Sequence, residues 1–352
     1  MTTTQTMRAW RTHHYGKPLE ALHLDTVAIP EPNPGELRVK VQAFTLNLND
    51  LERISGGNMM VEPELPYSPG MEVMGIVDAT GEGLENWIGK RVVATTAGAH
   101  GGYAQYAICP PVSAFELPDT VELPVAAAVY FPYHLAWLGL CDRAELQASE
   151  TVLITAAAGG SGSAAIQLAK NIGATVIALS GSADKVATCK KLGADHSLDY
   201  TEDDWPARVL EITGKRGVEV VFDNVGEAVM EQCMNCIAYN GRYLMMGFAS
   251  NKVVADEKFI IPRRLTMGNF RLCGVLLAYT DPAMSDFLKD AMGWNLSPQT
   301  LGQSIHDSVM DLLKNGRINP LIGQVVAFDQ VPQAIQAMAD RNTVGRSVVI
   351  VD

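Results

Sequence analysis

Three closely spaced glycines near the middle of the chain, Gly159, Gly160 and Gly162, have the spacing of a turn that binds a pyrophosphate group. Because glycine has no Cβ atom, the backbone at these positions can approach phosphate oxygens closely. A helical pattern starts directly after the turn, and the first turn of a helix offers an anion free N–H groups and a positive dipole end. We expect Ala158 and Ser161, in the same turn, to belong to the binding site.

The segments on either side of this turn predict how it is positioned. An apolar run from Val152 to Ile154 precedes it, a helical pattern extends from Ala164 to Asn171, and a second apolar run covers residues 174–179. Strand, glycine-rich turn, helix and strand in this order form the opening unit of a dinucleotide-binding domain. Glycine-rich loops are common by themselves. This one indicates nucleotide binding because it lies between a predicted strand and a predicted helix.

Length and composition narrow the class of protein. A chain of 352 residues predicts roughly two domains, and an apolar fraction of 47% is typical of a globular protein. The formal net charge of -12 argues against binding to nucleic acid or to an anionic membrane, both of which need basic patches. Six scattered cysteines, a start without a secretory pattern and no run of membrane-spanning length predict a cytoplasmic protein.

The chain changes character near Tyr130. Before it, short segments separated by proline and glycine predict a strand-rich fold. After it, helical and strand-like patterns alternate, which predicts a parallel sheet with helices on both faces and therefore an α/β class. The expected strands cover residues 37–43, 71–79, 91–95, 218–222, 242–246, 270–277, 324–328 and 347–351, and the expected helices cover residues 133–140, 184–192, 228–237, 304–315 and 332–339.

Further motifs occur in a characteristic order. Gln167 and Lys170 follow the glycine-rich turn, and the other motifs are Leu-Pro-Tyr-Ser-Pro-Gly at 65–70, Gly-Gly-Tyr-Ala-Gln-Tyr at 101–106, Val-Phe-Asp-Asn-Val-Gly at 221–226 and Gly-Arg-Tyr at 241–243. With these motifs, the chain resembles the medium-chain dehydrogenase/reductase superfamily over nearly its whole length. Within it, the chain is most similar to the zinc-independent quinone oxidoreductase (zeta-crystallin-like) branch.

The resemblance implies a fold and a division into domains. The expected fold is a Rossmann-type doubly wound parallel sheet plus a strand-rich, GroES-like catalytic domain. Residues 131–281 would form the NADPH-binding domain, residues 1–130 and 282–352 would form the catalytic domain, and a cleft would lie between the two. The resemblance also implies a homodimer joined through the edge strands of the nucleotide-binding sheets.

The residues at the zinc positions of the superfamily predict a protein without a metal. Zinc-dependent members carry Gly-His-Glu where this chain has Gly-Met-Glu at residues 70–72, and their first cysteine ligand falls among Phe44-Thr45-Leu46. Zinc binds deprotonated cysteine, histidine or carboxylate groups, and a thioether is a poor substitute. Cys233 and Cys236 have metal-ligand spacing, but their helical pattern favours a place on an apolar face.

The end of the second strand of the nucleotide unit predicts which nicotinamide cofactor binds. Sites that prefer NAD place an acidic residue there to bind the ribose 2′-hydroxyl, whereas this chain has Ser180 and Ser182. The resemblance implies that Lys185 and Tyr200 contact the 2′-phosphate of NADPH, although Lys185 alone could simply be solvated. The predicted cofactor-binding set is completed by Asn47, Asn224 and Gly247.

The resemblance also supplies candidates for the chemistry, which are Asn47, Asp50, Tyr67 and Tyr103. Asn47 would hold the nicotinamide ribose or a substrate oxygen, and a tyrosine hydroxyl would polarise the accepting oxygen or donate a proton. The alternative interpretations are a turn-forming asparagine and packing aromatic residues. Without a metal, the best acceptors take hydride easily, as quinones and carbonyl-conjugated double bonds do.

Some positions depart from the family pattern. Leu135 replaces a threonine found near the nicotinamide in many members, and Glu52 replaces an aromatic residue found in some. The residues that line the substrate pocket are therefore hard to infer from relatives. His134 is either a proton donor or a structural histidine. The segment Asn251 to Thr266 is long and charged, and it forms either a cap over the cleft or a surface excursion.

The leading hypothesis is an NADPH-dependent reductase that passes hydride directly to a small electrophilic substrate, a quinone or a related enone. A second hypothesis is an enoyl thioester reductase, in which Arg263 and Arg264 would bind the phosphates of coenzyme A. A third hypothesis, prompted by Leu135, is a noncatalytic NADPH-binding protein. Turnover with any acceptor separates the third hypothesis from the first two.

Overall fold

The computed structural model describes residues 5–57, 63–202, 204–246 and 262–352. Its internal contacts divide the chain into two compact units. The first, here named the strand-rich unit, comprises Met1–Tyr130, Ala278–His306 and Ile322–Asp352. The second, here named the parallel-sheet unit, comprises Phe131–Leu277 and Asp307–Leu321.

The parallel-sheet unit contains a six-stranded sheet in which each strand is parallel to its neighbours. The strand order is β10-β9-β8-β11-β12-β13, so the direction in which the chain adds strands reverses between β8 and β11. This is the order of a doubly wound dinucleotide-binding sheet. The strands are β8 (Thr151–Ile154), β9 (Thr175–Ser180), β10 (His196–Asp199), β11 (Val218–Asp223), β12 (Ile237–Met245) and β13 (Arg271–Gly274).

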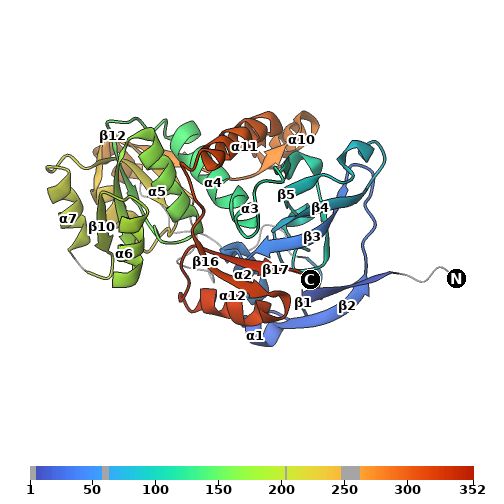
Figure 1. Cartoon of the computed structure of the whole chain (residues 1–352). Helices are drawn as coiled ribbons and strands as arrows, with labels where there is room; N and C mark the ends of the chain where they lie inside the picture. The colour runs from blue at the N-terminus through green and yellow to red at the C-terminus, as the bar shows by residue number, and fades with distance from the viewer. Residues whose placement is uncertain (1–4, 58–62, 203, 247–261) are drawn as a thin grey trace. The chain divides into compact units, whose positions relative to one another are not determined.

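Helices cover both faces of this sheet, as Figure 1 shows for α7 on one side and α5 and α6 on the other. Strands β8, β9 and β11 are almost continuously apolar and buried, as expected when a parallel sheet is covered on both faces. The helices are α4 (Tyr130–Trp137), α5 (Gly160–Ile172), α6 (Ala183–Lys191), α7 (Trp205–Ile212), α8 (Met230–Asn235) and α9 (Pro262–Gly268).

The strand-rich unit contains a seven-stranded sheet with the order β16-β17-β3-β4-β5-β7, in which β6 pairs with the outer part of β3. Antiparallel β1 and β2 form a separate ribbon, and β14 and β15 form a short parallel pair. The strands are β1 (Thr6–Thr12), β2 (Leu22–Ala28), β3 (Leu37–Thr45), β4 (Glu72–Thr80), β5 (Arg91–Thr95), β6 (Tyr106–Cys109), β7 (Ala114–Glu116), β14 (Tyr279–Thr280), β15 (Ser297–Pro298), β16 (Ile322–Ala327) and β17 (Arg346–Ile350).

The C-terminal segment completes the sheet that the N-terminal segment begins. Strand β17 pairs antiparallel with β3, with Val349 opposite Phe44, and both residues are buried in one apolar core. This pairing brings β17 beside residues 43–45, which directly precede the predicted site residues Asn47 and Asp50. The helices are α1 (Pro18–Ala21), α2 (Leu48–Ser55), α3 (Val125–Ala128), α10 (Pro282–Met292), α11 (Gln299–Lys314) and α12 (Val331–Ala339).

The segment Asp307–Leu321 corrects the predicted division into domains, which placed it in the catalytic domain. Side chains of α5 hold it on the parallel-sheet unit. Gln167 Nε2 donates to Asn319 O at 3.0 Å, Asn319 N donates back to Gln167 Oε1 at 2.7 Å, and Asn171 Nδ2 donates to Arg317 O at 2.9 Å. The chain therefore returns to the parallel-sheet unit before it completes the strand-rich one.

The fold class predicted from the sequence is confirmed, and most of the expected elements occur within a few residues of their predicted bounds. Several differ clearly: β10, α7, α9 and α10 were not predicted, α11 begins at Gln299 rather than near residue 304, and β12 begins at Ile237 where a helix was expected to end. Gly247 and the residues 251–261 of the predicted cap lie outside the described residues.

Candidate functional site

The glycine-rich turn joins the C-terminal end of β8 to the first turn of α5. Ala156 has a positive φ of 46°, and the N–H of Gly159 donates to Ala156 O at 2.9 Å. A Cβ atom on Gly162 would lie 2.5 Å from the same carbonyl oxygen, so only glycine allows the helix to start this close to the turn. No described side chain caps the start of α5, so its first N–H groups are available to an anion.

Asn224 lies beside this turn, at the end of β11. Its Nδ2 donates to Thr155 O at 2.9 Å, and its backbone N–H donates to Thr155 Oγ1 at 2.8 Å. Thr155 is the last residue before the turn, so the structure brings the predicted residue Asn224 to the point where the strand order reverses. Ligands bind at such switch points in doubly wound sheets. The sequence analysis did not identify Thr155.

The turn after β9 brings together three of the four residues predicted for the 2′-phosphate. Ser182 is the N-cap of α6, and its Oγ accepts from the N–H of Lys185 at 3.4 Å. Tyr200 lies directly against Gly181, where an added Cβ atom would be 2.5 Å from the tyrosine Oη. Ser180 differs, because it is buried and its Oγ faces Cys189 Sγ at 3.9 Å.

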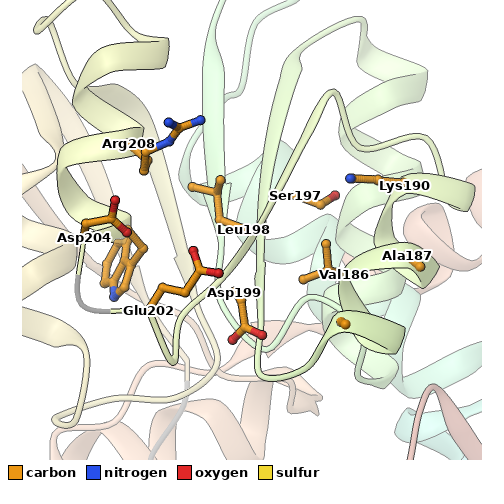
Figure 2. A pocket seen from close by; sticks show the side chains of 11 residues that line it. Val186, Ala187, Lys190, Ser197, Leu198, Asp199, Glu202, Asp204 and Arg208 are labelled. Atoms are coloured by element: carbon orange, nitrogen blue, oxygen red, sulfur yellow. The ribbon is translucent and has the colours of Figure 1, made fainter.

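A cavity of about 480 Å³ lies at the edge of the same sheet, between α6, β10 and α7. Figure 2 shows Lys190 and Arg208 on opposite sides of this cavity, with Asp199, Glu202 and Asp204 among the lining side chains. The cavity lining includes none of the predicted site residues. Because these carboxylates outnumber the two cations, the lining lacks the positive character that a phosphate group needs.

In the strand-rich unit, Asn47 and Asp50 begin helix α2. They form a capping box, and the N–H of Asn47 donates to Asp50 Oδ2 at 3.0 Å. Asp50 also accepts from the N–H of Met71 at 3.0 Å and from Tyr103 Oη at 3.1 Å. This carboxylate therefore joins the start of α2 to the Pro69–Met71 turn and to the segment of Tyr103.

Asp50 and Tyr103 are both fully buried, which governs their protonation. Burial raises the pKa of Asp50 to about 6, although Arg53 and the hydrogen bonds lower it in part. Burial also raises the pKa of the Tyr103 hydroxyl, which therefore remains a donor. The ring of Tyr103 stacks on Phe44 with their centroids 4.8 Å apart. Both residues therefore have the contacts of groups that position their neighbours.

A buried ion pair lies next to this cluster, and the sequence analysis missed it. Arg346, on β17, donates to the carboxylate of Glu72, to Thr45 Oγ1 and to Asn47 Oδ1, the last at 2.9 Å. Asn47 Nδ2 donates to Thr45 O at 3.2 Å, so the amide of Asn47 is held from both ends. Arg346 is separated from Glu72 by 274 residues, and no local pattern indicates their contact.

Tyr67 differs from Tyr103 in the surroundings of its hydroxyl group. Its backbone pairs with that of Thr12, and its ring meets His100 edge-on with their centroids 6.1 Å apart. Among the described residues the buried Tyr67 Oη makes no hydrogen bond of standard geometry, although the Thr12 hydroxyl is near enough to lower its pKa in part. Burial raises the pKa of Tyr67, so the hydroxyl keeps its proton at neutral pH.

The described residues do not form the zinc site of the superfamily. Met71 occupies the histidine position, and the carboxylate of Glu72 is paired with Arg346. Within the described ranges, no three histidine, cysteine, aspartate or glutamate residues are grouped as metal ligands. Cys233 and Cys236 are both buried in the core of the parallel-sheet unit.

The positions that depart from the family pattern lie on two helices. On α4, His134 is buried and Leu135 is partly buried; on α2, Glu52 is partly buried. In the part of the chain that the structure describes, no helix has the length and apolar character needed to span a membrane.

Replacing Asp50 tests the titration of the buried carboxylate. The unfolded chain releases this proton near a pKa of 3.8 and the folded chain near 6, so ionisation of Asp50 lowers the free energy of unfolding as the pH rises between these values. We expect Asp50→Asn to remove a pH-dependent loss of about 3 kcal/mol, measured by urea denaturation from about pH 4 to about pH 7. Asp119→Asn, at an exposed position, is the control. An unchanged pH profile in Asp50→Asn would show that Asp50 ionises normally.

Both parts of the chain match known protein families. Residues 33–119 match the alcohol dehydrogenase GroES-like domain, and residues 160–292 match the family described as zinc-binding dehydrogenase. The chain is 30% identical to the quinone oxidoreductase of Pseudomonas aeruginosa, over 96% of this chain and 97% of the relative. It is also 30% identical to the quinone oxidoreductase-like protein 2 homolog of Nematostella vectensis, over 99% of this chain and 90% of the relative.

Solved structures agree with these sequence matches. The structure of Escherichia coli quinone oxidoreductase complexed with NADPH has a TM-score of 0.83 and 27% sequence identity, covering 97% of this chain and 99% of that chain. The quinone oxidoreductase of Pseudomonas syringae has a TM-score of 0.82 and 27% identity, covering 98% of this chain and 99% of that chain. The chain is therefore an oxidoreductase of the medium-chain dehydrogenase/reductase superfamily and belongs to its quinone oxidoreductase branch.

Proposed function

We propose that this protein is an NADPH-dependent reductase that transfers hydride to a quinone or a related conjugated carbonyl compound without a metal ion. The observation that carries the proposal is the turn after β9. At this turn Ser182 accepts from the N–H of Lys185, the Tyr200 hydroxyl lies against Gly181, and the sequence has no acidic residue at the end of β9 to repel a 2′-phosphate.

NADPH supplies the hydride, and the parallel-sheet unit binds and orients it. The start of α5 binds the pyrophosphate through Gly159, Gly160 and Ser161, with Ala158 beside them. Ser182, Lys185 and Tyr200 bind the 2′-phosphate. Asn224, held by Thr155, contributes at the switch point. Ser180 supports this turn from inside, and Gly247 remains a predicted contact.

The acceptor binds against Asn47 and Tyr67 in the strand-rich unit. Asn47 Oδ1 accepts a hydrogen bond from Arg346, and one hydrogen of Asn47 Nδ2 is donated to Thr45 O. The second Nδ2 hydrogen is therefore the donor that Asn47 can offer to a ligand. The Tyr67 hydroxyl keeps its proton and polarises the accepting oxygen. Asp50 and Tyr103 act one step away, by fixing the start of α2.

The proposal that no metal takes part is supported by the ligand positions. With a thioether at Met71 and the Glu72 carboxylate bonded to Arg346, a zinc ion would lack ligands at the position that the superfamily uses. The homodimer, the cytoplasmic location and the absence of a nucleic-acid or membrane partner stay predictions from the sequence.

The thioester alternative has less support. Arg264, one of the two arginines predicted to bind coenzyme A phosphates, donates to Glu231 Oε1 at 3.2 Å and to Asn235 Oδ1 at 2.5 Å on α8. It would have to break these contacts to bind a phosphate. A conjugated thioester therefore serves best as the competing substrate in a test of the proposed function.

Turnover is the direct test. Purified protein treated with a chelator is expected to oxidise NADPH with an ortho-quinone faster than with a short enoyl-CoA, because a quinone accepts hydride more easily than a conjugated thioester does. The measurement is the loss of NADPH absorbance under each acceptor. Faster turnover of the thioester would contradict the quinone assignment, and activity that returns only after zinc is added would contradict metal independence.

Replacing Lys185 tests the choice of cofactor. Lys185→Ala removes a cation from the 2′-phosphate, so the KM for NADPH is expected to rise about tenfold or more while the KM for NADH changes little. Steady-state kinetics with both cofactors measure the two constants. Lys190→Ala, on the same helix but outside the turn, is the control. Equal effects of Lys185→Ala on both cofactors would exclude the phosphate contact.

The two tyrosines are expected to respond differently to loss of the hydroxyl. Tyr67→Phe is expected to lower kcat by about tenfold, because the hydrogen bond to the accepting oxygen strengthens in the transition state. Tyr103→Phe leaves a buried acceptor on Asp50 and is expected to lower the free energy of unfolding by about 1 to 3 kcal/mol with a smaller change in kcat. Kinetics and urea denaturation of both variants give the comparison. An unchanged kcat in Tyr67→Phe would remove this tyrosine from the proposed mechanism.

A further inference from the structure

Asp223, the last residue of β11, is a buried carboxylate at the point where the strand order reverses. Its Oδ1 accepts from Thr155 Oγ1 at 2.7 Å, and its Oδ2 accepts from Tyr243 Oη at 2.6 Å. The N–H groups of Val225 and Gly226 donate to it at 3.0 and 3.1 Å. Burial raises the pKa of Asp223, and these four donors counteract the cost of burying its charge.

These contacts link three strands and one loop. Thr155 follows β8, Asp223 ends β11, and Tyr243 lies on β12, while the two backbone donors belong to the loop that begins at Asn224. Thr155 Oγ1 donates to Asp223 and accepts from the N–H of Asn224, so one hydroxyl serves both partners. The shape of the loop 224–226 therefore depends on groups that lie in the sheet beneath it.

The sheet order assigns this loop to one half of a dinucleotide. A doubly wound sheet consists of two mononucleotide-binding halves, and the half that starts with the glycine-rich turn, β8-β9-β10, contains the residues predicted for the adenosine 2′-phosphate. The loop after β11 belongs to the other half, β11-β12-β13. A ligand atom bound by this loop is thus on the nicotinamide side of the cofactor.

We propose that Tyr243, acting through Asp223, is a positioning residue that sets the loop 224–226 for the nicotinamide half of the cofactor. Tyr243 is itself fully buried, so it acts through the carboxylate rather than by touching the ligand. Its hydroxyl holds Oδ2, the atom that Gly226 also uses, while Thr155 and Val225 use Oδ1. Loss of the hydroxyl leaves Gly226 as the one remaining donor to Oδ2 among these four, so the carboxylate is held less firmly and the loop loosens. This inference rests on the proposed function, because it concerns the binding of NADPH.

Two ligands separate this role from general damage to the unit. Adenosine 2′,5′-bisphosphate carries the 2′-phosphate and the adenosine of NADPH but lacks the nicotinamide half. In Tyr243→Phe, the Kd for NADPH is expected to rise by about threefold to thirtyfold, the range typical of a change within a coupled network, and the Kd for adenosine 2′,5′-bisphosphate to stay constant. Both constants are measured by titration calorimetry of the purified full chain.

Matched variants keep the test interpretable. Tyr239→Phe, also on β12 but with its side chain 74% exposed, is expected to bind both ligands as the wild type does. Thr155→Ser keeps the shared hydroxyl and is expected to retain the wild-type Kd for NADPH, whereas Thr155→Val removes it and is expected to resemble Tyr243→Phe. Thermal unfolding of each variant confirms that it is folded at the temperature of the titration.

Three results would overturn the inference. Equal weakening of both ligands in Tyr243→Phe would mean that the substitution damages the whole unit. Unchanged binding of NADPH in Tyr243→Phe would mean that Tyr243 does not set the loop, whatever the effect of Thr155→Val. Failure of the wild type to bind NADPH, with adenosine 2′,5′-bisphosphate bound or not, would overturn the proposed cofactor itself, and this outcome is distinct from the first two.

Discussion

The first turn of α5 lies directly on the turn that leads into it, and a Cβ atom on Gly162 would come within 2.7 Å of Ala157 Cα. This close approach aligns the free N–H groups of the helix with the C-terminal edge of the sheet. It also places Thr155, immediately before the turn, within reach of Asn224 and Asp223 from the neighbouring strand. The predicted pyrophosphate-binding turn and Asn224 are therefore arranged around this one contact of helix and turn.

Buried carboxylates organise the loops in both units. Asp50 in the strand-rich unit and Asp223 in the parallel-sheet unit each accept from two backbone N–H groups and from a tyrosine hydroxyl. A carboxylate has two oxygens and several acceptor positions, so one side chain can fix groups from several segments at once. Glu72 differs from these two aspartates because its partner is a buried guanidinium. This pairing places Arg346 beside Asn47.

Much of the parallel-sheet unit could be predicted from the sequence because its signals are local. The glycines, the apolar run before them and the helical pattern after them lie within about twenty residues, and the turn at Ser182 lies just beyond the next strand. Tyr200 lies against Gly181, between the predicted residues Ser180 and Ser182, and the binding role of these residues stays a prediction. The inward orientation of Ser180 was not predictable, because the sequence does not show which face of a strand end a small hydroxyl occupies.

The strand-rich unit was harder to predict because its important contacts join distant residues. In the sequence, nothing distinguishes Arg346 from other charged residues near a strand. Its role is visible only in the fold, where the pairing of β17 with β3 brings its guanidinium to Glu72. The prediction treated Asp50 and Tyr103 as chemical groups, whereas their burial gives them structural contacts. Helix α10 was missed because none of its residues is buried, so no apolar face of the unit required it. The helix is bounded instead by its N-cap residue Asp281 and by Gly293, which ends it in the left-handed conformation.

The return of Asp307–Leu321 to the parallel-sheet unit has a consequence for how the chain folds during synthesis. Gln167 and Asn171 find their partners only after residues 317–319 have left the ribosome, about 150 residues later. The strand-rich unit begins first, yet β3 lacks β17 until residues 346–350 emerge. The parallel-sheet unit is therefore complete only when residue 321 has been made, and the strand-rich unit only when residues 322–352 have followed. The interleaved chain path makes both units complete late in synthesis, so strand edges such as that of β3 stay exposed for a long period.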